Sequence, residues 1–423
     1  MVPDNVVETA TPAGAGTAVS QVPGKSASAY AAALLAAERL GPQGARAADP
    51  RPVRSVGVIG AGLMASQLAL LFARQLGVPV LITDLSQARV DAALSGIAGH
   101  LDKLVLRGQL TESAARELGS LVRGTVDKRD FRNCDVVIEA VFEELSVKRA
   151  VFAEVEPLLR ADALLLTNTS SLSLAAMGRG LTHPERLVGL HFFNPVAVLP
   201  LVEIISTDDN DDVSVATACS LARLLGKTAV LVTDAPGFVV NRVLSRLFCE
   251  LLRIIDDGAD LQLADHALDP LGLPMTPLTL LGFIGPAVQL HICEAMHAAY
   301  PDRFYVSTSL AALAQAGLRG YLDKSGTVLP EAAALLPGAD ACPPAPAPGA
   351  ESIRIRILDA LAEEVGLMLA EKVVAGPADV DLCMLLGANF PAHQGGITPT
   401  LDLSGASRRV WGRDFHPGPG FTR

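Results

Sequence analysis

The chain has 423 residues; half of them are hydrophobic, 19% are charged, and the formal net charge is −11. A chain of this length has room for two or three domains, each with its own core. No stretch reaches the roughly 20 consecutive apolar residues that a membrane span needs, and we expect neither a signal peptide nor an anchor. The negative charge and the lack of a Lys- or Arg-rich block argue against nucleic acid or an anionic membrane as a partner.

The six cysteines are scattered along the chain and form no Cys-x-x-Cys pair. This distribution is typical of a reducing compartment and argues against a zinc site or a disulfide framework. We therefore expect a cytoplasmic protein that holds no metal ion.

We interpret residues 1–50 as an N-terminal extension. Residues 1–28 are rich in Ala, Gly, Thr, Ser and Pro without periodicity, which predicts disorder. Residues 29–41 are apolar enough for one short helix, and the Pro-containing segment 49–52 then leads into the ordered part of the chain.

Strands and helices alternate over residues 51–236. Ser55 to Ile59 predicts a buried strand, Leu63 to Leu76 a helix, and Val80 to Asp84 a second strand. Such alternation predicts a mostly parallel sheet with helices on both faces. Further strands are expected at 135–139, 163–167, 187–190, 201–205 and 228–232, and further helices at 86–107, 146–159 and 212–225.

The pattern changes to helices alone after residue 236. Residues 237–335 carry apolar side chains at helical spacing and no strand-like run, which predicts an all-α domain. Residues 336–350 are rich in proline and predict a semi-rigid linker. The amphipathic pattern returns at 351–374, and we interpret 351–423 as a second helical unit that weakly repeats the first.

A glycine-rich turn joins the first strand to the first helix. In Gly60-Ala61-Gly62-Leu63-Met64-Ala65, the first glycine permits a tight turn and the second lets backbone approach a pyrophosphate at the helix N-terminus. Asp84 ends the second strand, where its carboxylate can accept from an adenosine ribose and repel a 2′-phosphate. The fold class predicted is therefore a Rossmann-type NAD-binding domain followed by an all-α domain with two helical repeats, although such a turn also occurs in folds that bind no nucleotide.

A histidine and a glutamate stand where chemistry is expected in such a sheet. His191 follows the strand Leu187 to Leu190, and ligands gather at the carboxyl ends of parallel strands. Glu203 lies within an apolar strand, where a buried carboxylate needs a partner. Paired with Glu203, His191 has one nitrogen free to take a hydroxyl proton. The alternatives are a structural histidine and a glutamate that faces solvent.

Two polar residues extend this candidate site. Ser170 follows the strand Leu164 to Thr167 and points into the same crevice, or else caps a helix, a role that suits Ser171 better. Asn241 opens the helical region and faces the sheet, or else is an ordinary residue of a helix surface.

Five motifs in order resemble those of L-3-hydroxyacyl-CoA dehydrogenases. The resemblance covers residues 54–330, and from residue 351 the chain resembles the extra helical repeat in the dehydrogenase half of the bacterial multifunctional fatty-acid oxidation protein. Its hydratase half has no counterpart here, and Ala65-Ser66-Gln67 stands where the family carries a glycine-rich stretch. The motifs are Gly60-Ala-Gly-Leu-Met, Asn168-Thr-Ser-Ser-Leu, His191-Phe-Phe-Asn-Pro, Leu201-Val-Glu and Pro236-Gly-Phe-Val-Val-Asn-Arg.

The resemblance implies a role for each site residue. His191 is the acid–base group, Glu203 its partner, and Ser170 and Asn241 contact the substrate. The cofactor-binding positions implied by motif and resemblance are Gly60, Gly62, Leu63, Met64, Asp84, Val141, Glu143, Lys148, Ser170 and Asn194.

The function implied is the NAD-dependent oxidation of (S)-3-hydroxyacyl-CoA to 3-oxoacyl-CoA, with an acyl-CoA substrate between the sheet domain and the helices. Association with other β-oxidation enzymes is a further expectation. We also expect the two helical units to pair within one chain, which would make the protein a monomer. The alternatives are a dehydrogenase of another β-hydroxy acid or of an acyl-carrier-protein substrate, and an NAD-binding sensor or assembly subunit without turnover.

Overall fold

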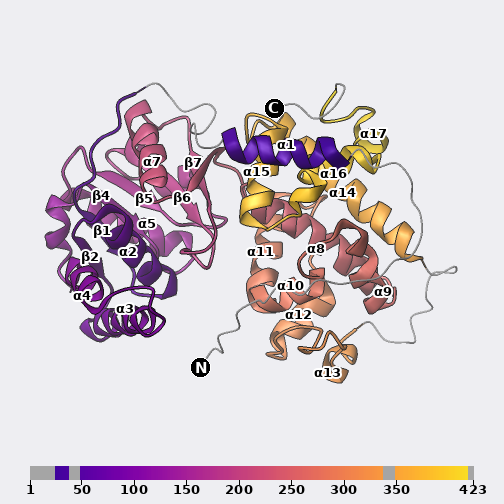
Figure 1. Ribbon diagram of the computed structural model, residues 1–423, viewed down its shortest axis with the longest axis horizontal. Coiled ribbons are helices and arrows are strands. Elements are labelled where there is room, and N and C mark those ends of the chain that lie inside the picture. Colours follow the sequence, from indigo (N-terminus) through magenta and orange to yellow (C-terminus); the bar gives the residue numbers. More distant parts are fainter. Residues whose placement is uncertain (1–23, 38–47, 337–347, 418–423) are drawn as a thin grey trace.

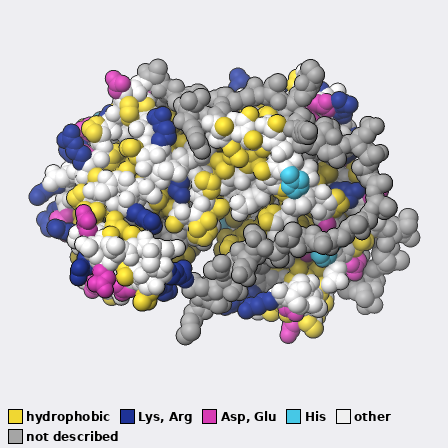
Figure 2. Space-filling view, viewed as in Figure 1, with side chains coloured by type: hydrophobic (Ala, Val, Ile, Leu, Met, Phe, Trp, Pro, Cys, Tyr) yellow, Lys and Arg dark blue, Asp and Glu magenta, His cyan; other side chains and the backbone are white. Residues whose placement is uncertain are grey.

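The computed structural model describes residues 24–37, 48–336 and 348–417, which form an α/β lobe and a helical lobe side by side (Figure 1). On the face shown in Figure 2, Lys and Arg side chains are spread over both lobes and interspersed with Asp and Glu. The predictions of disorder at 1–23, of helix at 38–41 and of a linker at 337–347 concern residues outside the described ranges.

The α/β lobe is built on one eight-stranded sheet with the order β3-β2-β1-β4-β5-β6-β7-β8. Every pair of neighbours is parallel except β6 and β7, which run antiparallel. The predicted mostly parallel sheet is confirmed. The strands are β1 (Val56–Ile59), β2 (Val80–Thr83), β3 (Val122–Thr125), β4 (Val136–Glu139), β5 (Leu164–Thr167), β6 (Leu187–Phe192), β7 (Leu201–Ser206) and β8 (Thr228–Thr233).

Helices cover both faces of the sheet. Apolar side chains of α2 (Leu63–Leu76), α3 (Gln87–Leu106) and α7 (Asp212–Leu224) pack on one face. Side chains of α5 (Leu145–Val155) and α6 (Leu174–Gly178) pack on the other. The helix α4 (Glu112–Leu121) and the strand β3 that follows it were not predicted; in β3, Arg123 and Gly124 interrupt the apolar run.

The helical lobe is centred on α8 (Val240–Asp256) and α14 (Ala350–Ala370), which share one apolar core. Arg242 of α8 pairs with Glu364 of α14, and Arg356 of α14 pairs with Glu250 of α8, so the two helices run antiparallel. The expected packing of the second helical unit on the first is therefore present. The other helices are α9 (Leu261–Asp265), α10 (Pro277–Ile284), α11 (Pro286–Ala299), α12 (Thr308–Gln315), α13 (Pro330–Ala333), α15 (Pro377–Gly387), α16 (Ile397–Leu403) and α17 (Ala406–Trp411). Short 3₁₀ turns lie at Lys128–Asn133, Glu156–Leu158, Pro184–Arg186, His266–Leu271 and Ala392–Gln394.

The helix α1 (Gly24–Ala37) lies on the helical lobe beside α15 (Figure 1). The prediction that residues 1–28 are disordered is therefore wrong for residues 24–28. Ala27, Tyr30 and Leu34 of α1 are buried, and the Tyr30 hydroxyl donates to Asp381 at 3.0 Å. A surface made by residues far along the chain thus orders this segment.

Within the described parts of the chain, no single helix has the length and apolar character to cross a membrane. The bent pair α10 and α11, which meet at 99°, passes the same test of length and composition when taken together. In those parts the structure also contains no group of three or more His, Cys, Asp or Glu side chains that could hold a metal ion. The five cysteines that it describes are buried.

Candidate active site

His191 and Glu203 face each other across the antiparallel pair β6 and β7. The register places the two residues directly opposite, so both side chains project from the same face of the sheet. Nδ1 of His191 lies 2.7 Å from Oε2 of Glu203, and both residues are buried. The sequence-derived pairing is therefore present, and Nε2 is the ring nitrogen left over for another partner.

The second carboxylate oxygen of Glu203 is held by the start of α8. Oε1 accepts hydrogen bonds from the backbone N–H groups of Val239 and Val240, at 3.2 and 3.1 Å. The rings of Phe193 and Phe238 lie 4.5 and 5.5 Å from the His191 ring. Backbone donors and aromatic walls thus fix the orientation of the pair.

The loop after β5 is held in place by Glu143. Its Oε1 accepts from the Thr169 hydroxyl at 2.6 Å and from the backbone N–H of Ser170 at 2.7 Å. Asn241 of α8 reaches this loop and donates to the carbonyl oxygen of Ser170 at 3.3 Å. Glu143, Ser170 and Asn241, predicted separately, therefore lie together. The helix cap considered for Ser171 is wrong, because Ser173 caps α6 and Ser171 instead donates its N–H to Glu143.

Lys148 links Glu143 to a residue that the sequence analysis missed. Its ammonium group is buried and donates to both oxygens of Glu139, at 2.7 and 2.9 Å, and lies 3.1 Å from Glu143. Burial by itself raises the pKa of Glu143, but Lys148 and the hydrogen bonds from the loop after β5 outweigh it and lower the pKa below its ordinary value. Glu139 is the last residue of the apolar strand β4. A carboxylate in an apolar strand is the same signal that identified Glu203.

The glycine turn has the shape that a dinucleotide needs. Gly60 has a φ of +113°, and a Cβ there would lie 2.5 Å from the carbonyl oxygen of Ala140. A Cβ at Gly62 would meet nothing within 4 Å, and no side chain caps the N-terminus of α2. The open approach and the free N–H groups of the helix suit a pyrophosphate. Residues of this chain therefore fit NAD.

Asp84 supports the same turn. Its Oδ2 accepts from the N–H of Ala61 at 2.8 Å, and Arg89 lies 3.4 Å from Oδ1. One carboxylate therefore holds the turn and also stands where an adenosine ribose is expected.

Gln67 was noted in the sequence as a departure from the family, and the structure shows what it contacts. Its Nε2 donates to Oδ1 of Asn194 at 3.1 Å, and its Oε1 accepts from the N–H of Val196 at 2.9 Å. The side chain thus ties α2 to the turn that follows His191.

These residues surround a cleft of about 770 Å³ between the two lobes, a size in the range of ligand sites. Helices α8, α10 and α11 form its far wall. Lys148 and Glu203 lie behind the lining, and Gly60, Gly62, Leu63 and Asp84 lie outside the cleft, at the adjoining turn. The predicted site residues that line the cleft are Met64, Val141, Glu143, Ser170, His191, Asn194 and Asn241.

Two consecutive domain families match this chain. The 3-hydroxyacyl-CoA dehydrogenase NAD-binding domain matches residues 55–235, and the 3-hydroxyacyl-CoA dehydrogenase C-terminal domain matches residues 237–328. The chain belongs to the 3-hydroxyacyl-CoA dehydrogenase family. This confirms the resemblance and the order of an NAD-binding α/β domain and a helical domain in a family of oxidoreductases.

Known proteins are similar over most of this chain. The fatty acid oxidation complex subunit alpha of Acinetobacter baylyi is 33% identical over 382 residues, which are 85% of this chain and 52% of that protein. The chain thus spans about half the length of the curated relatives it matches. The structure of FadB2 from Mycobacterium tuberculosis is 33% identical with a TM-score of 0.61 and covers 65% of this chain and 97% of its own. The structure of the 3-hydroxybutyryl-CoA dehydrogenase of Escherichia coli is 25% identical with a TM-score of 0.70, and it covers 87% of this chain and 97% of its own.

Proposed function

We propose that this chain oxidises the 3-hydroxyl of (S)-3-hydroxyacyl-CoA to the 3-oxo group, with NAD as the hydride acceptor. The observation that carries the proposal is the buried His191–Glu203 pair at the wall of the cleft, in a chain whose family is that of 3-hydroxyacyl-CoA dehydrogenases. A protein that only bound NAD would have no use for an acid–base pair of this kind.

His191 accepts the hydroxyl proton on Nε2 while the hydride leaves C3 of the substrate. Glu203 accepts from Nδ1–H, which leaves Nε2 unprotonated beforehand and stabilises the imidazolium formed in the reaction. Bound NAD supplies the acceptor for the hydride. The substrate loses one proton, to His191, and one hydride, to NAD, so the step balances without a further reactant.

Ser170 and Asn241 orient the substrate in this proposal. Both line the cleft beside His191, and the hydrogen bond between them joins the sheet to α8. Their hydroxyl and amide groups suit the 3-oxygen and the thioester carbonyl, because each offers a donor to an oxygen. Positioning of the reacting atoms contributes a large part of such catalysis.

Formation of NADH from 3-hydroxybutyryl-CoA tests this function, together with the reverse reaction from acetoacetyl-CoA. We expect turnover by the wild type and a loss of ~10²- to 10⁴-fold in kcat for His191→Gln, with NADH affinity little changed. Turnover of the free hydroxy acid or of an acyl-carrier-protein thioester, but not of the CoA thioester, would instead support the alternative substrates. NADH binding without any turnover would support a sensor.

We also propose that the chain is monomeric, because α14 covers the apolar face of α8 that would otherwise be exposed. A chain truncated before residue 340 should then dimerise or aggregate, whereas the full chain should sediment as a monomer. Two clean monomers would contradict this. The scattered cysteines, which form no Cys-x-x-Cys pair, suit our proposal of a cytoplasmic location. The names of the relatives suit association with other β-oxidation enzymes.

A further inference from the structure

A second cavity, of about 350 Å³, adjoins the catalytic cleft. Because Asn241 lines both hollows and also contacts the Ser170 loop, they meet beside the position of the reacting carbon. The residues that line both are Phe193, Asn194, Asn241, Leu244, Phe283 and Ile284.

The second cavity is lined almost wholly by hydrocarbon. Among the described residues that line it, none carries a charged side chain, and the polar ones are Asn194, Asn241, Asn389 and Thr400. The phosphates of CoA would lose their hydration there without gaining a partner, whereas an alkyl chain would gain by leaving water. Its volume lies at the lower end of the range of about 300 to 1,000 Å³ found for ligand pockets.

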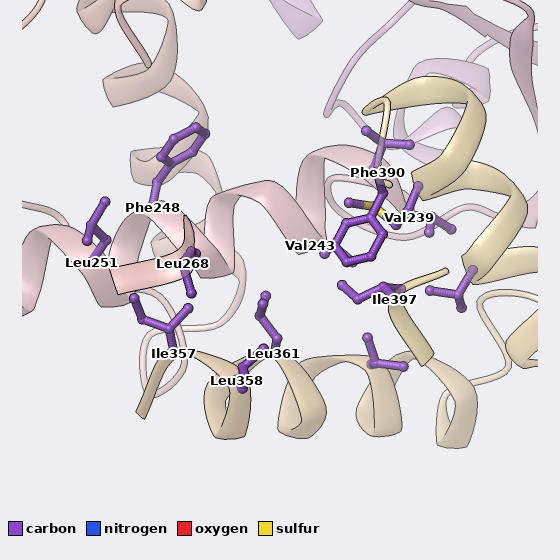
Figure 3. Close-up of a cluster of buried hydrophobic side chains, with 14 of the residues drawn as sticks. Val239, Val243, Phe248, Leu251, Leu268, Ile357, Leu358, Leu361, Phe390 and Ile397 are labelled. Atoms are coloured by element: carbon purple, nitrogen blue, oxygen red, sulfur yellow. The ribbon is translucent and has the colours of Figure 1, made fainter. Parts of the chain in front are cut away.

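Three parts of the chain build this cavity. The turn after β6 closes one side, α8 and α10 form a second, and the second helical unit forms the third. Figure 3 shows the side chains of Val243, Leu361, Phe390 and Ile397 close together between α8, α14 and the segments beyond α15. All of them line the cavity. The second helical unit therefore does more than cover α8, because it also supplies one wall of an apolar cavity.

We propose that this cavity receives the acyl tail of the substrate, and that the enzyme prefers thioesters whose chains extend well beyond four carbons. The inference rests on the proposed function, since it assigns C1 to C3 to the cleft and the remaining carbons to the cavity. The CoA part then stays in the larger cleft. The second helical unit sets how long a tail is accepted, because Leu358, Leu361 and Met384 face the tail from the side opposite to α8 and α10.

The inference gives a definite chain-length dependence. Each methylene transferred from water to an apolar site is worth about fourfold in affinity. The specificity constant kcat/KM should therefore rise by up to about fourfold per methylene until the cavity is filled, and then level off or fall.

The test compares kcat/KM for 3-hydroxyacyl-CoAs of four, eight, twelve and sixteen carbons. Leu247→Trp fills the cavity from α8 and should lower the twelve-to-four-carbon ratio by about tenfold or more. Ala388→Leu narrows it from the end of α15 and gives a second measurement should Leu247→Trp fold poorly. Leu403→Trp is the matched control, because Leu403 is exposed on the surface of α16 and does not line the cavity.

The possible results distinguish failure of the acyl-tail assignment from failure of the proposed dehydrogenase function. A ratio lowered by the two cavity variants and unchanged by Leu403→Trp supports the inference. A flat chain-length profile in the wild type, or a ratio that neither cavity variant changes while the four-carbon substrate is turned over, overturns it. Lack of turnover at every chain length contradicts the proposed function itself.

Discussion

Replacing Glu203 by Gln tests the proposed acid–base pair sharply, because glutamine keeps the shape of the side chain. Oε2 lies 2.7 Å from Nδ1 of His191, while Oε1 accepts from the backbone N–H groups of Val239 and Val240. Those two groups can only donate, so the one oxygen of glutamine must face them. The NH₂ group then faces Nδ1.

Opposite an NH₂ donor, His191 must carry its proton on Nε2, the nitrogen that has to accept the hydroxyl proton. The reverse orientation would leave two buried N–H groups without an acceptor, at about 1 to 3 kcal/mol each. We therefore expect kcat to fall by ~10²- to 10⁴-fold, the range seen when a catalytic histidine is held in the wrong tautomer or lost. NADH affinity should stay within a few-fold, since Glu203 lies behind the cleft lining.

Steady-state NADH formation measures kcat, and NADH fluorescence titration measures affinity. Glu156→Gln is a control for the loss of a buried carboxylate, because Glu156 is also buried, accepts the backbone N–H groups of Thr182 and His183, and lies 3.5 Å from Arg186. If Glu203→Gln turned over at close to the wild-type rate, the pair would have no catalytic role. If both variants lost kcat equally, the loss would reflect stability and not the tautomer.

Three further predictions concern the cofactor, the interface between the helical units and a buried carboxyl. Asp84→Ala removes the charge that repels a 2′-phosphate and leaves Arg89 free to bind that phosphate. The ratio of kcat/KM with NAD to kcat/KM with NADP should therefore fall by about tenfold, and equal use of both cofactors by the wild type would refute this. Glu364→Gln removes one of the two carboxylates that pair with the buried guanidinium of Arg242 and should lower the free energy of unfolding by roughly 3 kcal/mol, whereas an unchanged urea midpoint would argue against it. Burial raises the pKa of Asp381 to about 7, above the ordinary value of about 3.9, so the folded state binds this proton more tightly and stability falls as pH rises from about 4 through 7. Between about pH 6 and pH 8 the free energy of unfolding of the wild type should fall by ~1.4 kcal/mol more than that of Asp381→Asn. Equal decreases for the two proteins in urea titrations would contradict the raised pKa of Asp381.

Features that depend on local pattern were predictable from the sequence. The bounds of α2, Leu63–Leu76, follow from the glycine turn before them and from helical spacing of apolar residues. The proximity of His191 and Glu203 followed from a buried carboxylate that needed a partner near a strand end. Both arguments use only nearby residues and the geometry of one sheet.

Features that depend on distant contacts were not predictable in the same way. α1 has weak amphipathic character, and its order rests on Asp381, hundreds of positions away in sequence. The bridge from Gln67 to Asn194 and the pairing of Lys148 with Glu139 likewise join separate elements. The second cavity is formed by side chains from all three parts of the chain, so no single stretch of sequence encodes it.

Because α8 and α14 pair within one chain, the interface between them does not have to be symmetric. When identical chains pair across a two-fold axis, each surface must complement itself and every substitution appears twice. Here the facing surfaces are encoded separately, so residues of α14 to α16 can vary while α8 stays the same. We expect natural variants with different substrate ranges to differ mainly within 350–403, far along the chain from His191, because that segment can be remodelled without touching the reacting groups.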